Sequence, residues 1–302
     1  MTLTELRYLV SLARLKHFGR AAEYCHVTQP TLSIAVKKLE EELGVPLFER
    51  LKNTVHLTPQ GQQIVKQAER VLGEADILQA LAQANQDPLK GSLKLGAIFT
   101  IGPYLFPHII PQLQKLAPEM PLYIEENYTA KLREKLRLGE LDVIIISLPF
   151  TEQDVLTQTL YDEPFVLLLP PSHALSAEAT VACEALNAEQ LLLLGEGHCF
   201  RDQVLQACPN IQHKYGESKD AASITEGSSL ETLRHMVASG MGITVLPQMA
   251  AGDNSYAAGL LTTRPFTAPS PKRTVALAWR TSFTRPQVID VLNQAIRACQ
   301  LF

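Results

Sequence analysis

Residues 18–61 read FGRAAEYCHVTQPTLSIAVKKLEEELGVPLFERLKNTVHLTPQG, and this stretch decides the fold of the N-terminal part of the chain. Residues 29–43 place leucine and valine three or four positions apart, which predicts a helix with one apolar face. Thr28 before this segment and Gly44 after it are typical capping residues, so they predict where the helix begins and ends. Residues 47–61 then predict a small hairpin wing.

Two shorter helices are predicted before the long one. Thr2 and Glu5 fit a capping box that opens a helix near the start of the chain, and residues 19–27 predict a second short helix. Four residues of the long helix are expected to face the core: Leu32, Val36, Leu39 and Leu43. The pattern predicts a winged helix-turn-helix domain over residues 1–58.

The other face of the long helix is polar and suits a recognition helix in the major groove of DNA. Gln29 can pair with a base edge, Ile34 can contact a thymine methyl group, and Lys37 can meet a phosphate. The candidate DNA contacts are Thr28, Gln29, Pro30, Thr31, Ser33, Ile34, Lys37 and Lys38 on the helix, and Arg50 and Lys52 on the wing. The alternative is a three-helix packing unit with a solvated polar face.

The stretch resembles the winged helix-turn-helix of LysR-type transcriptional regulators. The resemblance rests on the F-x-x-A-A start, the T-Q-P opening of the recognition helix, the K-x-L-E-x-x-L-G-x-x-L-F-x-R run and the L-T-x-x-G end. It implies DNA binding, self-association and a regulatory domain made of two α/β subdomains of periplasmic-binding-protein type.

A long helix is predicted after the wing, over residues 59–86, and residues 59–89 are assigned as a linker. Its apolar positions recur every three or four residues: Ile64, Ala68, Val71, Ala75, Leu78 and Leu81. Such a stripe needs a partner, and a second copy of the chain is the simplest one. Packing of this helix on its own body is the alternative.

The remainder, residues 90–302, alternates apolar strand-sized runs with helical patterns, which predicts a parallel α/β sheet. The LysR-type resemblance divides it into subdomain I, about 90–163 with 268–302, and subdomain II, about 164–267. In such folds ligands bind between subdomains at the ends of strands. A LysR-type regulator that responds to a small metabolite in that cleft, with incidental cysteines, is therefore an alternative function.

Composition limits the remaining classes. The net charge is −4, but residues 1–58 carry eight basic and six acidic residues, so the head is slightly basic and the body acidic. No run is long enough to cross a membrane and no signal peptide is recognised, so a cytoplasmic location is expected. The five cysteines have neither disulfide-framework nor zinc spacing, and we expect no cofactor or metal.

Two cysteines stand out in residues 195–208, GEGHCFRDQVLQAC. Cys199 is expected at the N-terminal end of a helix, beside His198 and Arg201, where the thiolate is favoured over the thiol. A thiolate attacks peroxide to give a sulfenic acid, which the core-facing Cys208 can capture. If the interval is helical, the two Cα atoms lie roughly 13 Å apart. A disulfide tolerates only about 7 Å, so bridging requires local unwinding.

The plainer alternative is that these two cysteines fill space in a core, and we expect this of Cys25, Cys183 and Cys299. Residues 195–208 and 228–247, however, are similar to the hydrogen-peroxide-sensing members of the LysR-type family. The similarity extends over essentially the whole chain. The resemblance implies that Cys199 is peroxidatic and Cys208 resolving. It implies a peroxide pocket shaped by Thr100, Thr129, His198, Arg201 and Arg273.

The sequence therefore favours a peroxide-responsive transcription factor that is not an enzyme, and it leaves open whether the protein activates, represses or does both. Its expected partners are promoter DNA, further copies of the chain as a dimer or tetramer, RNA polymerase and a cellular thiol reductant. A thiol peroxidase that also binds DNA is a further alternative, but no paired catalytic carboxylates, phosphate loop or metal spacing supports it.

Overall fold

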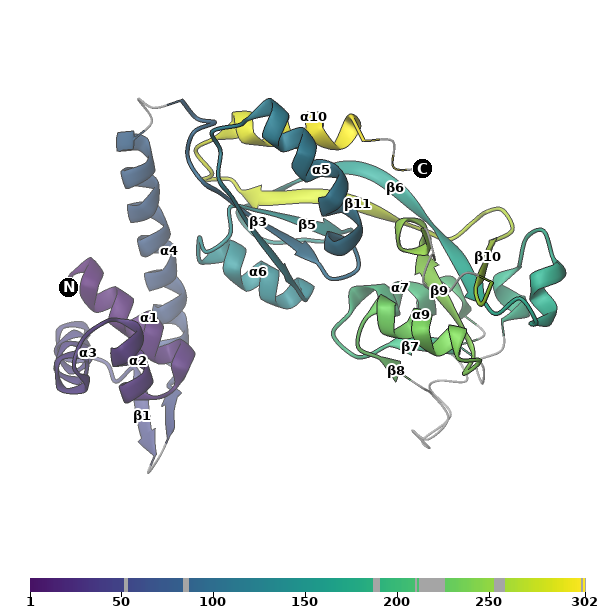
Figure 1. The fold of residues 1–302 in the computed structure, drawn as a ribbon. Coiled ribbons are helices and arrows are strands. Elements are labelled where there is room, and N and C mark those ends of the chain that lie inside the picture. Colours follow the sequence, from purple (N-terminus) through teal and green to yellow (C-terminus); the bar gives the residue numbers. More distant parts are fainter. Residues whose placement is uncertain are drawn as a thin grey trace. The chain divides into compact units, whose positions relative to one another are not determined.

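The computed structural model describes residues 1–51, 54–83, 87–186, 191–209, 211, 226–252, 259–299 and 301. Contacts divide the chain into two compact units, residues 1–85 with 137–139 and residues 86–136 with 140–302. Each unit is described by itself (Figure 1).

The first unit is a winged helix-turn-helix followed by a long helix. Its elements are α1 (Leu3–Leu15), α2 (Phe18–Tyr24), α3 (Gln29–Leu43), β1 (Phe48–Leu51), β2 (Thr54–Leu57) and α4 (Pro59–Gln83). Thr2 makes the predicted capping box with Glu5, and Thr28 Oγ1 accepts the amide hydrogen of Thr31. Gly44 ends α3 with φ at 71°, a conformation that suits glycine. The predicted bounds of α3 are confirmed.

The core of this unit is made by all of its helices. Leu32, Val36 and Leu39 are buried as predicted, but Leu43 is 37% exposed, so its assignment to the core face is wrong. Leu43 is the last residue of α3, where the helix has run past the end of the core. Ala68, on the predicted dimerisation stripe, is buried against this same core. The first turns of α4 are thus covered by the unit itself.

The described residues of the second unit form one mixed sheet of nine strands, in the order β4-β3-β5-β11-β6-β9-β7-β8, with β10 on β6. Its strands are β3 (Leu93–Ile98), β4 (Leu122–Asn127), β5 (Val143–Ser147), β6 (Val155–Leu169), β7 (Leu191–Leu194), β8 (Glu226–Gly227), β9 (Ile243–Pro247), β10 (Thr262–Pro265) and β11 (Lys272–Arg280). Its helices are α5 (Gly102–Leu116), α6 (Thr129–Arg137), α7 (Cys199–Ala207), α9 (Leu230–Ala238) and α10 (Pro286–Arg297), with short 3-10 turns η1 (Ala174–Ala177), η2 (Cys183–Ala185) and η4 (Gln248–Ala251).

The prediction of a parallel sheet is only partly right. β3 runs parallel to β4 and β5, and β7 runs parallel to β8 and β9, because helices connect them. β11, however, pairs antiparallel with both β5 and β6, and β6 pairs antiparallel with β9. The returning C-terminal segment accounts for this mixture, and its strand partners lie more than 100 residues earlier in the chain.

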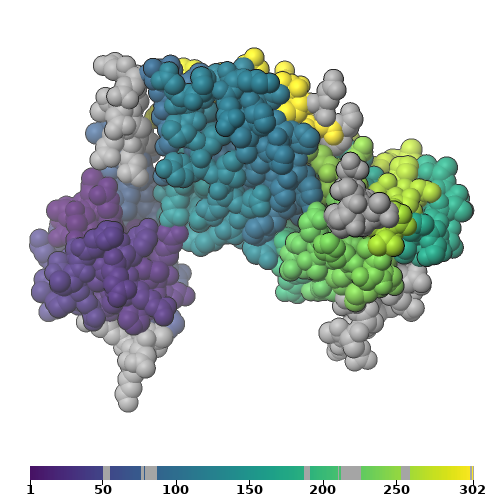
Figure 2. All heavy atoms as spheres, in the orientation of Figure 1, coloured from purple at the N-terminus to yellow at the C-terminus, as the bar shows by residue number. Residues whose placement is uncertain are grey.

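Two hydrophobic cores define two lobes of this unit. The first lobe surrounds β3, β4, β5 and β11, with α5 and α10 on one face and α6 on the other (Figure 1). The second lobe surrounds β7, β9 and the last part of β6, with α7 and α9. In the space-filling view the blue and teal atoms of the first lobe adjoin the green atoms of the second (Figure 2).

Two elements extend beyond their predicted bounds. Residues 107–117 predict a helix, but α5 begins at Gly102, because Pro103 lies in its first turn, where a missing amide hydrogen costs no helical hydrogen bond. Residues 164–170 predict a strand, but β6 begins at Val155. Its first part is polar and half-exposed, so it lacks the apolar run that marks the second part. The predicted border of the subdomains lies inside this strand.

Candidate functional site

Helix α7 carries the two predicted redox thiols at its opposite ends. Cys199 is its first residue, His198 is the N-cap, and Cys208 is the C-cap, with its amide donating to the Val204 carbonyl. The nine-residue helix confirms the predicted local structure, and its rise places the two Cα atoms about 13 Å apart. All five cysteines are free thiols. A bridge between Cys199 and Cys208 therefore requires α7 to unwind.

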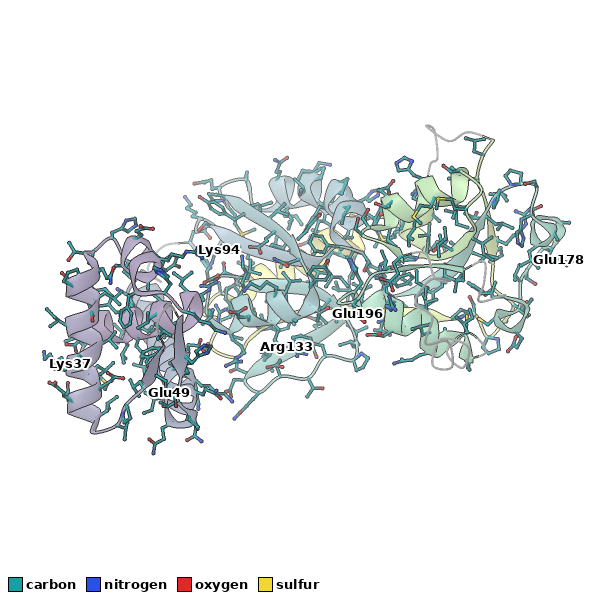
Figure 3. The ribbon with its side chains drawn as sticks, turned by 90° about the horizontal axis from the view of Figure 1, so that it is seen from below. Lys37, Glu49, Lys94, Arg133, Glu178 and Glu196 are labelled. Atoms are coloured by element: carbon teal, nitrogen blue, oxygen red, sulfur yellow. The ribbon has the colours of Figure 1, made fainter. Side chains whose placement is uncertain are left out.

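The two thiols belong to different cores. Cys199 is half-buried and packs against the core of the first lobe, whereas Cys208 is 2% exposed in the core of the second. Figure 3 shows Glu196, in the loop before α7, where the two lobes meet. Unwinding α7 consequently disturbs packing on both sides of this boundary.

An aromatic group surrounds the start of α7. The His198 ring lies edge-on to Tyr128, with ring centroids 4.7 Å apart, and Phe99 contacts both rings. Burial lowers the pKa of His198, and a hydrogen bond to the Ser228 backbone acts in the opposite direction. Gly197 has φ at +93°, and a Cβ atom there would lie 3.3 Å from the Tyr128 ring. Glycine thus allows the loop to approach Tyr128 closely.

Buried polar atoms without a hydrogen-bond partner among the described residues include Thr129 Oγ1, His198 Nε2 and Gln203 Oε1. Thr129 follows Tyr128, which contacts His198, and Gln203 lies one turn beyond Cys199 on the same side of α7. Buried polar atoms normally bind a partner, so this set suits a small polar molecule that both donates and accepts hydrogen bonds. Gln203 was not predicted, although its i+4 spacing from Cys199 was a usable signal.

Arg273 and Thr100, predicted to share the pocket, are in direct contact. Arg273 Nη1 donates to Thr100 Oγ1 and Nη2 to the Thr100 carbonyl, both at 2.8 Å. Arg273 Nε donates at 2.8 Å to Glu163 Oε2, and the two side chains are almost completely buried. The guanidinium also lies 5.4 Å from the ring centroid of Phe200, the neighbour of Cys199. Glu163 was missed because the pairing of β6 with β11 positions it.

Arg201 makes its described contacts within the second lobe. Its Nη1 donates at 2.9 Å to the Leu194 carbonyl and forms an ion pair with Glu226. These bonds hold the first turn of α7 to β7 and β8. A role of Arg201 toward the Cys199 thiolate stays a prediction.

Cys208 has an unexpected neighbour. Cys183, the first residue of η2, packs against the hydrophobic core that contains the Cys208 side chain. The neighbouring Cys208 lowers the pKa of Cys183, whereas the neighbouring Cys183 together with burial raises the pKa of Cys208. The expectation that Cys183 only fills space is therefore incomplete, because sequence spacing gave no sign that a contact across 25 positions would form.

The candidate DNA-binding face is solvent-accessible. Ile34 is 69% exposed, which is unusual for an apolar residue of a small domain, and Lys37 projects from the outer side of α3 (Figure 3). Exposed neighbours on the same face are Thr28, Gln29, Pro30, Thr31 and Lys38, with Ser33 half-buried. Arg50 lies on β1, but its side chain and Lys52 are outside the described residues.

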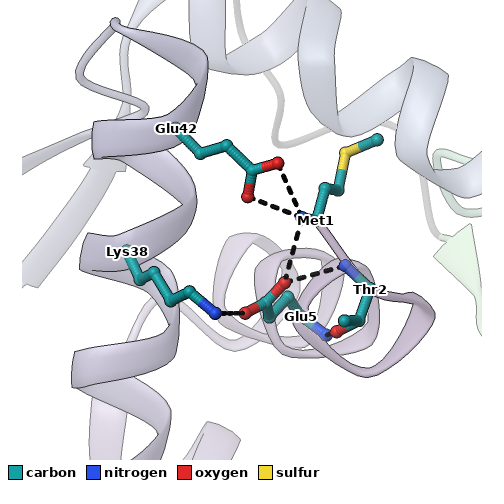
Figure 4. A network of polar contacts seen from close by, with 5 residues as sticks. All are labelled: Met1, Thr2, Glu5, Lys38 and Glu42. Atoms are coloured by element: carbon teal, nitrogen blue, oxygen red, sulfur yellow. Dashed lines mark hydrogen bonds and ion pairs between the residues drawn. The ribbon is translucent and has the colours of Figure 1, made fainter.

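Both lysines of α3 also have acidic partners. Lys37 pairs with Glu41, and Lys38 Nζ lies 3.2 Å from Glu5 Oε1. Figure 4 shows that Glu5 belongs to a network in which the Met1 ammonium group also contacts Glu42. Lys38 thus ties α3 to the start of α1. Its predicted phosphate contact requires it to leave Glu5 or to serve both.

Within the described ranges, no helix is long and apolar enough to cross a membrane. The same residues contain no cluster of histidine, cysteine and carboxylate side chains that could hold a metal ion.

The fold and the site define a two-part bacterial regulator. Residues 3–62 match the model of bacterial regulatory helix-turn-helix proteins of the lysR family, and residues 86–300 match the LysR substrate binding domain. This chain belongs to the LysR family of DNA-binding transcription regulators.

The chain is similar over nearly its whole length to peroxide-related regulators of the LysR family. The chain is 39% identical, over 99% of its length and 95% of the relative, to the DNA-binding transcriptional dual regulator OxyR of Escherichia coli K12. It is 39% identical, over 98% of its length and 94% of the relative, to a probable hydrogen peroxide-inducible genes activator of Mycobacterium leprae. Among solved structures, a full-length OxyR cysteine-to-aspartate variant from Pseudomonas aeruginosa matches with a TM-score of 0.79 and 59% identity, covering 100% of this chain and 96% of that one.

Proposed function

We propose that this chain is a cytoplasmic, DNA-binding transcription regulator that senses hydrogen peroxide through Cys199 and Cys208. One observation carries the proposal: the two thiols lie at opposite ends of α7, anchored in different cores. The naming of its relatives as hydrogen peroxide-inducible genes activators supports the same signal.

The chemistry proceeds in two balanced steps. The Cys199 thiolate attacks one oxygen of hydrogen peroxide, the O–O bond breaks, and the leaving hydroxide takes a proton to become water. Cys199 then carries a sulfenic acid. The Cys208 sulfur attacks that sulfur, the S–O bond breaks, and a second water leaves as the disulfide forms. A cellular dithiol reverses the bridge and regenerates both thiols.

The unpartnered polar atoms support a peroxide site at the start of α7. Peroxide both donates and accepts hydrogen bonds, and Thr129 Oγ1 and His198 Nε2 offer complementary partners next to the start of α7. Arg273 is hydrogen-bonded to Thr100 and packs on the ring of Phe200, the residue after Cys199. Arg201 holds the first turn of α7 to β7. We assign Arg273 and Arg201 as positioning residues.

The disulfide acts as a switch because the bridge and the helix exclude each other. The bridged form must abandon the Cys208–Val204 backbone bond and the packing of Cys208. This rearrangement alters how copies of the chain assemble and so how they bind promoter DNA and recruit RNA polymerase. Copies join as dimers through α4, on which Val71 and Leu78 are exposed, and assemble further into tetramers.

DNA is contacted by the exposed face of α3 and by the wing. Thr28, Gln29, Pro30 and Thr31 approach base edges and phosphates at the start of the helix. Ser33, Ile34, Lys37 and Lys38 continue this face, and Arg50 and Lys52 reach the backbone or minor groove.

The test compares DNA footprints of the reduced and peroxide-treated protein. Wild type should change its footprint after stoichiometric peroxide, and Cys199→Ser should not, while the matched Cys299→Ser variant should behave as wild type. A Cys199→Ser protein that still changes its footprint would refute the proposal. A footprint that responds to a small metabolite but not to thiol blockers would favour the metabolite-sensing alternative, and sustained peroxide turnover would favour a thiol peroxidase.

A further inference from the structure

Cys208 has two possible partners, and only one of them requires α7 to unwind. Cys199 is at the far end of the helix, whereas Cys183 packs against the same core as Cys208 and lies near enough for each thiol to shift the pKa of the other. Both members of this second pair belong to the second lobe, with Cys208 in its core and Cys183 packed against that core. A bond between them would therefore link residues that are neighbours in the folded protein.

The two thiols of the pair differ in accessibility. Cys183 is half-exposed in the short turn η2, and Cys208 is 2% exposed. Small oxidants can therefore reach Cys183 first. The neighbouring Cys208 lowers the pKa of Cys183, although burial and the neighbouring Glu184 act in the opposite direction. Cys183 is thus the member that attacks the oxidant, and Cys208 lies beside it as the second thiol.

We propose that Cys183 and Cys208 form a second redox-active dithiol, oxidised by low-molecular-weight disulfides such as glutathione disulfide, that withdraws Cys208 from Cys199. This inference rests on the proposed function only for its effect on peroxide signalling. The bridge itself depends on the contact between Cys183 and Cys208.

The reaction is a pair of thiol–disulfide exchanges. The Cys183 thiolate attacks one sulfur of glutathione disulfide, the S–S bond breaks, and one glutathione thiolate leaves. The Cys208 thiol loses its proton and attacks the Cys183 sulfur of the mixed disulfide. The second glutathione leaves as a thiolate and takes up that proton. Cys183 and Cys208 are oxidised by two electrons, and glutathione disulfide is reduced to two glutathione molecules.

The consequence for signalling follows from α7. A Cys183–Cys208 bridge leaves α7 intact, because this disulfide joins the C-terminal end of the helix to η2 and does not connect the two ends of the helix. Peroxide can still oxidise Cys199, but the sulfenic acid then has no resolving thiol. The second dithiol therefore holds the protein in its helical form while the small-disulfide pool is oxidised.

The first experiment uses Cys199→Ser protein, so that its outcome does not depend on the peroxide mechanism. After incubation with glutathione disulfide, peptides are mapped by mass spectrometry. Trypsin separates Cys183 from Cys208 by cutting after Arg201, but no lysine or arginine lies between residues 138 and 200, so Glu-C is added to shorten the Cys183 peptide by cutting after Glu184 and Glu196. We expect a linked pair of peptides that contain Cys183 and Cys208. The double variant Cys183→Ser/Cys199→Ser should instead lack any intramolecular bridge.

Two results overturn the dithiol: no Cys183–Cys208 link in the Cys199→Ser protein, or a link equally formed by Cys25 or Cys299. The second experiment treats wild type with glutathione disulfide, removes the reagent and adds peroxide. We expect at least a fivefold smaller footprint change than in untreated wild type, and a fivefold higher yield of Cys199 trapped by dimedone. Equal footprint changes would overturn the blocking role. Failure of the untreated protein to respond would instead count against the proposed function.

Discussion

Gln203 Nε2 donates a 2.7 Å hydrogen bond to Ser147 Oγ, which ties the middle of α7 to the end of β5. The bond joins the helix of one lobe to the sheet of the other. It is made by the same side chain whose Oε1 has no partner in the described protein. Gln203 therefore holds the helix that has to unwind.

Gln203→Ala should accelerate formation of the Cys199–Cys208 disulfide. Loss of one neutral hydrogen bond removes about 1 kcal/mol from the folded helix, which corresponds to about fivefold in rate if the bond breaks before bridging. The measurement is the rate at which the Cys199 sulfenic acid is converted to the disulfide after stoichiometric peroxide, because this step follows peroxide binding. Gln206→Ala, on the exposed side of α7, is the matched control. Equal rates for both variants would show that unwinding does not limit the reaction.

The buried Arg273–Glu163 pair should be far more important for stability than the neighbouring pair on the same strands. Arg273→Leu leaves a buried carboxylate without its cation and should cost about 3–5 kcal/mol of unfolding free energy. Lys272→Ala removes the exposed partner of Asp162 and should cost less than about 1 kcal/mol. Urea unfolding compares the two. The double variant Arg273→Leu/Glu163→Leu should recover stability relative to Arg273→Leu, and its failure to do so would contradict charge imbalance as the cause.

Stability should fall in acid partly through His198. Burial lowers the pKa of His198 in the folded protein, so below the unfolded-state value near 6.5 the unfolded chain binds more protons. The free energy of unfolding should therefore decrease as pH falls from about 6.5 through the lowered pKa, and His198→Gln should flatten this decrease. Urea midpoints between about pH 5 and 7.5 provide the measurement, with the exposed His108→Gln as control. If the free energy of unfolding falls equally with pH in wild type, His198→Gln and His108→Gln, His198 is not the source of the decrease.

Residues of α3 should separate into base-reading and phosphate-binding groups. Gln29→Ala should weaken binding to the specific site by about 1–3 kcal/mol with little effect on random DNA. Lys37→Ala should weaken both and reduce the salt-dependence slope by about 1 per monomer contact. Lys66→Ala, an exposed lysine on α4, is the charge-matched control. An equal loss of affinity for specific and random DNA in Gln29→Ala would show that Gln29 contacts the DNA phosphate backbone and not a base.

The exposed part of α4 should mediate self-association. Leu78 is 71% exposed, and Leu78→Glu should shift the protein toward monomers because it places a charge on the proposed interface. Sedimentation velocity over a concentration series measures the change. Lys66→Glu should leave the assembly unchanged, and similar behaviour of Leu78→Glu would remove α4 as the interface.

Local chemistry made the first unit predictable. The bounds of α3 follow from Thr28, Gly44 and helical spacing between them, all of which act within a few residues. The same is true of α7, where a glycine-rich loop precedes a short amphipathic stretch. Leu43 shows the limit, because periodicity does not reveal where a core ends.

Contacts made across the fold were not predictable. Glu163 lies within a polar segment of β6 and meets Arg273 only because β11 returns 110 positions later. Cys183 meets Cys208 because η2 and the end of α7 pack on the same core. Neither partner has a distinguishing neighbour in the sequence, so chain topology alone brings them together.

Strand β6 runs without interruption through both lobes of the second unit, and this continuity limits which part of the unit can change conformation. Backbone hydrogen bonds to β11 extend from Val155 to Pro164, and the strand then continues into the second lobe, paired with β9 and β10. Rotation of one lobe against the other would bend this strand, which is paired on both sides, whereas α7 is a single short helix. A bridge between Cys199 and Cys208 therefore rearranges one helix, while the backbone pairing of β6 with its neighbours is kept.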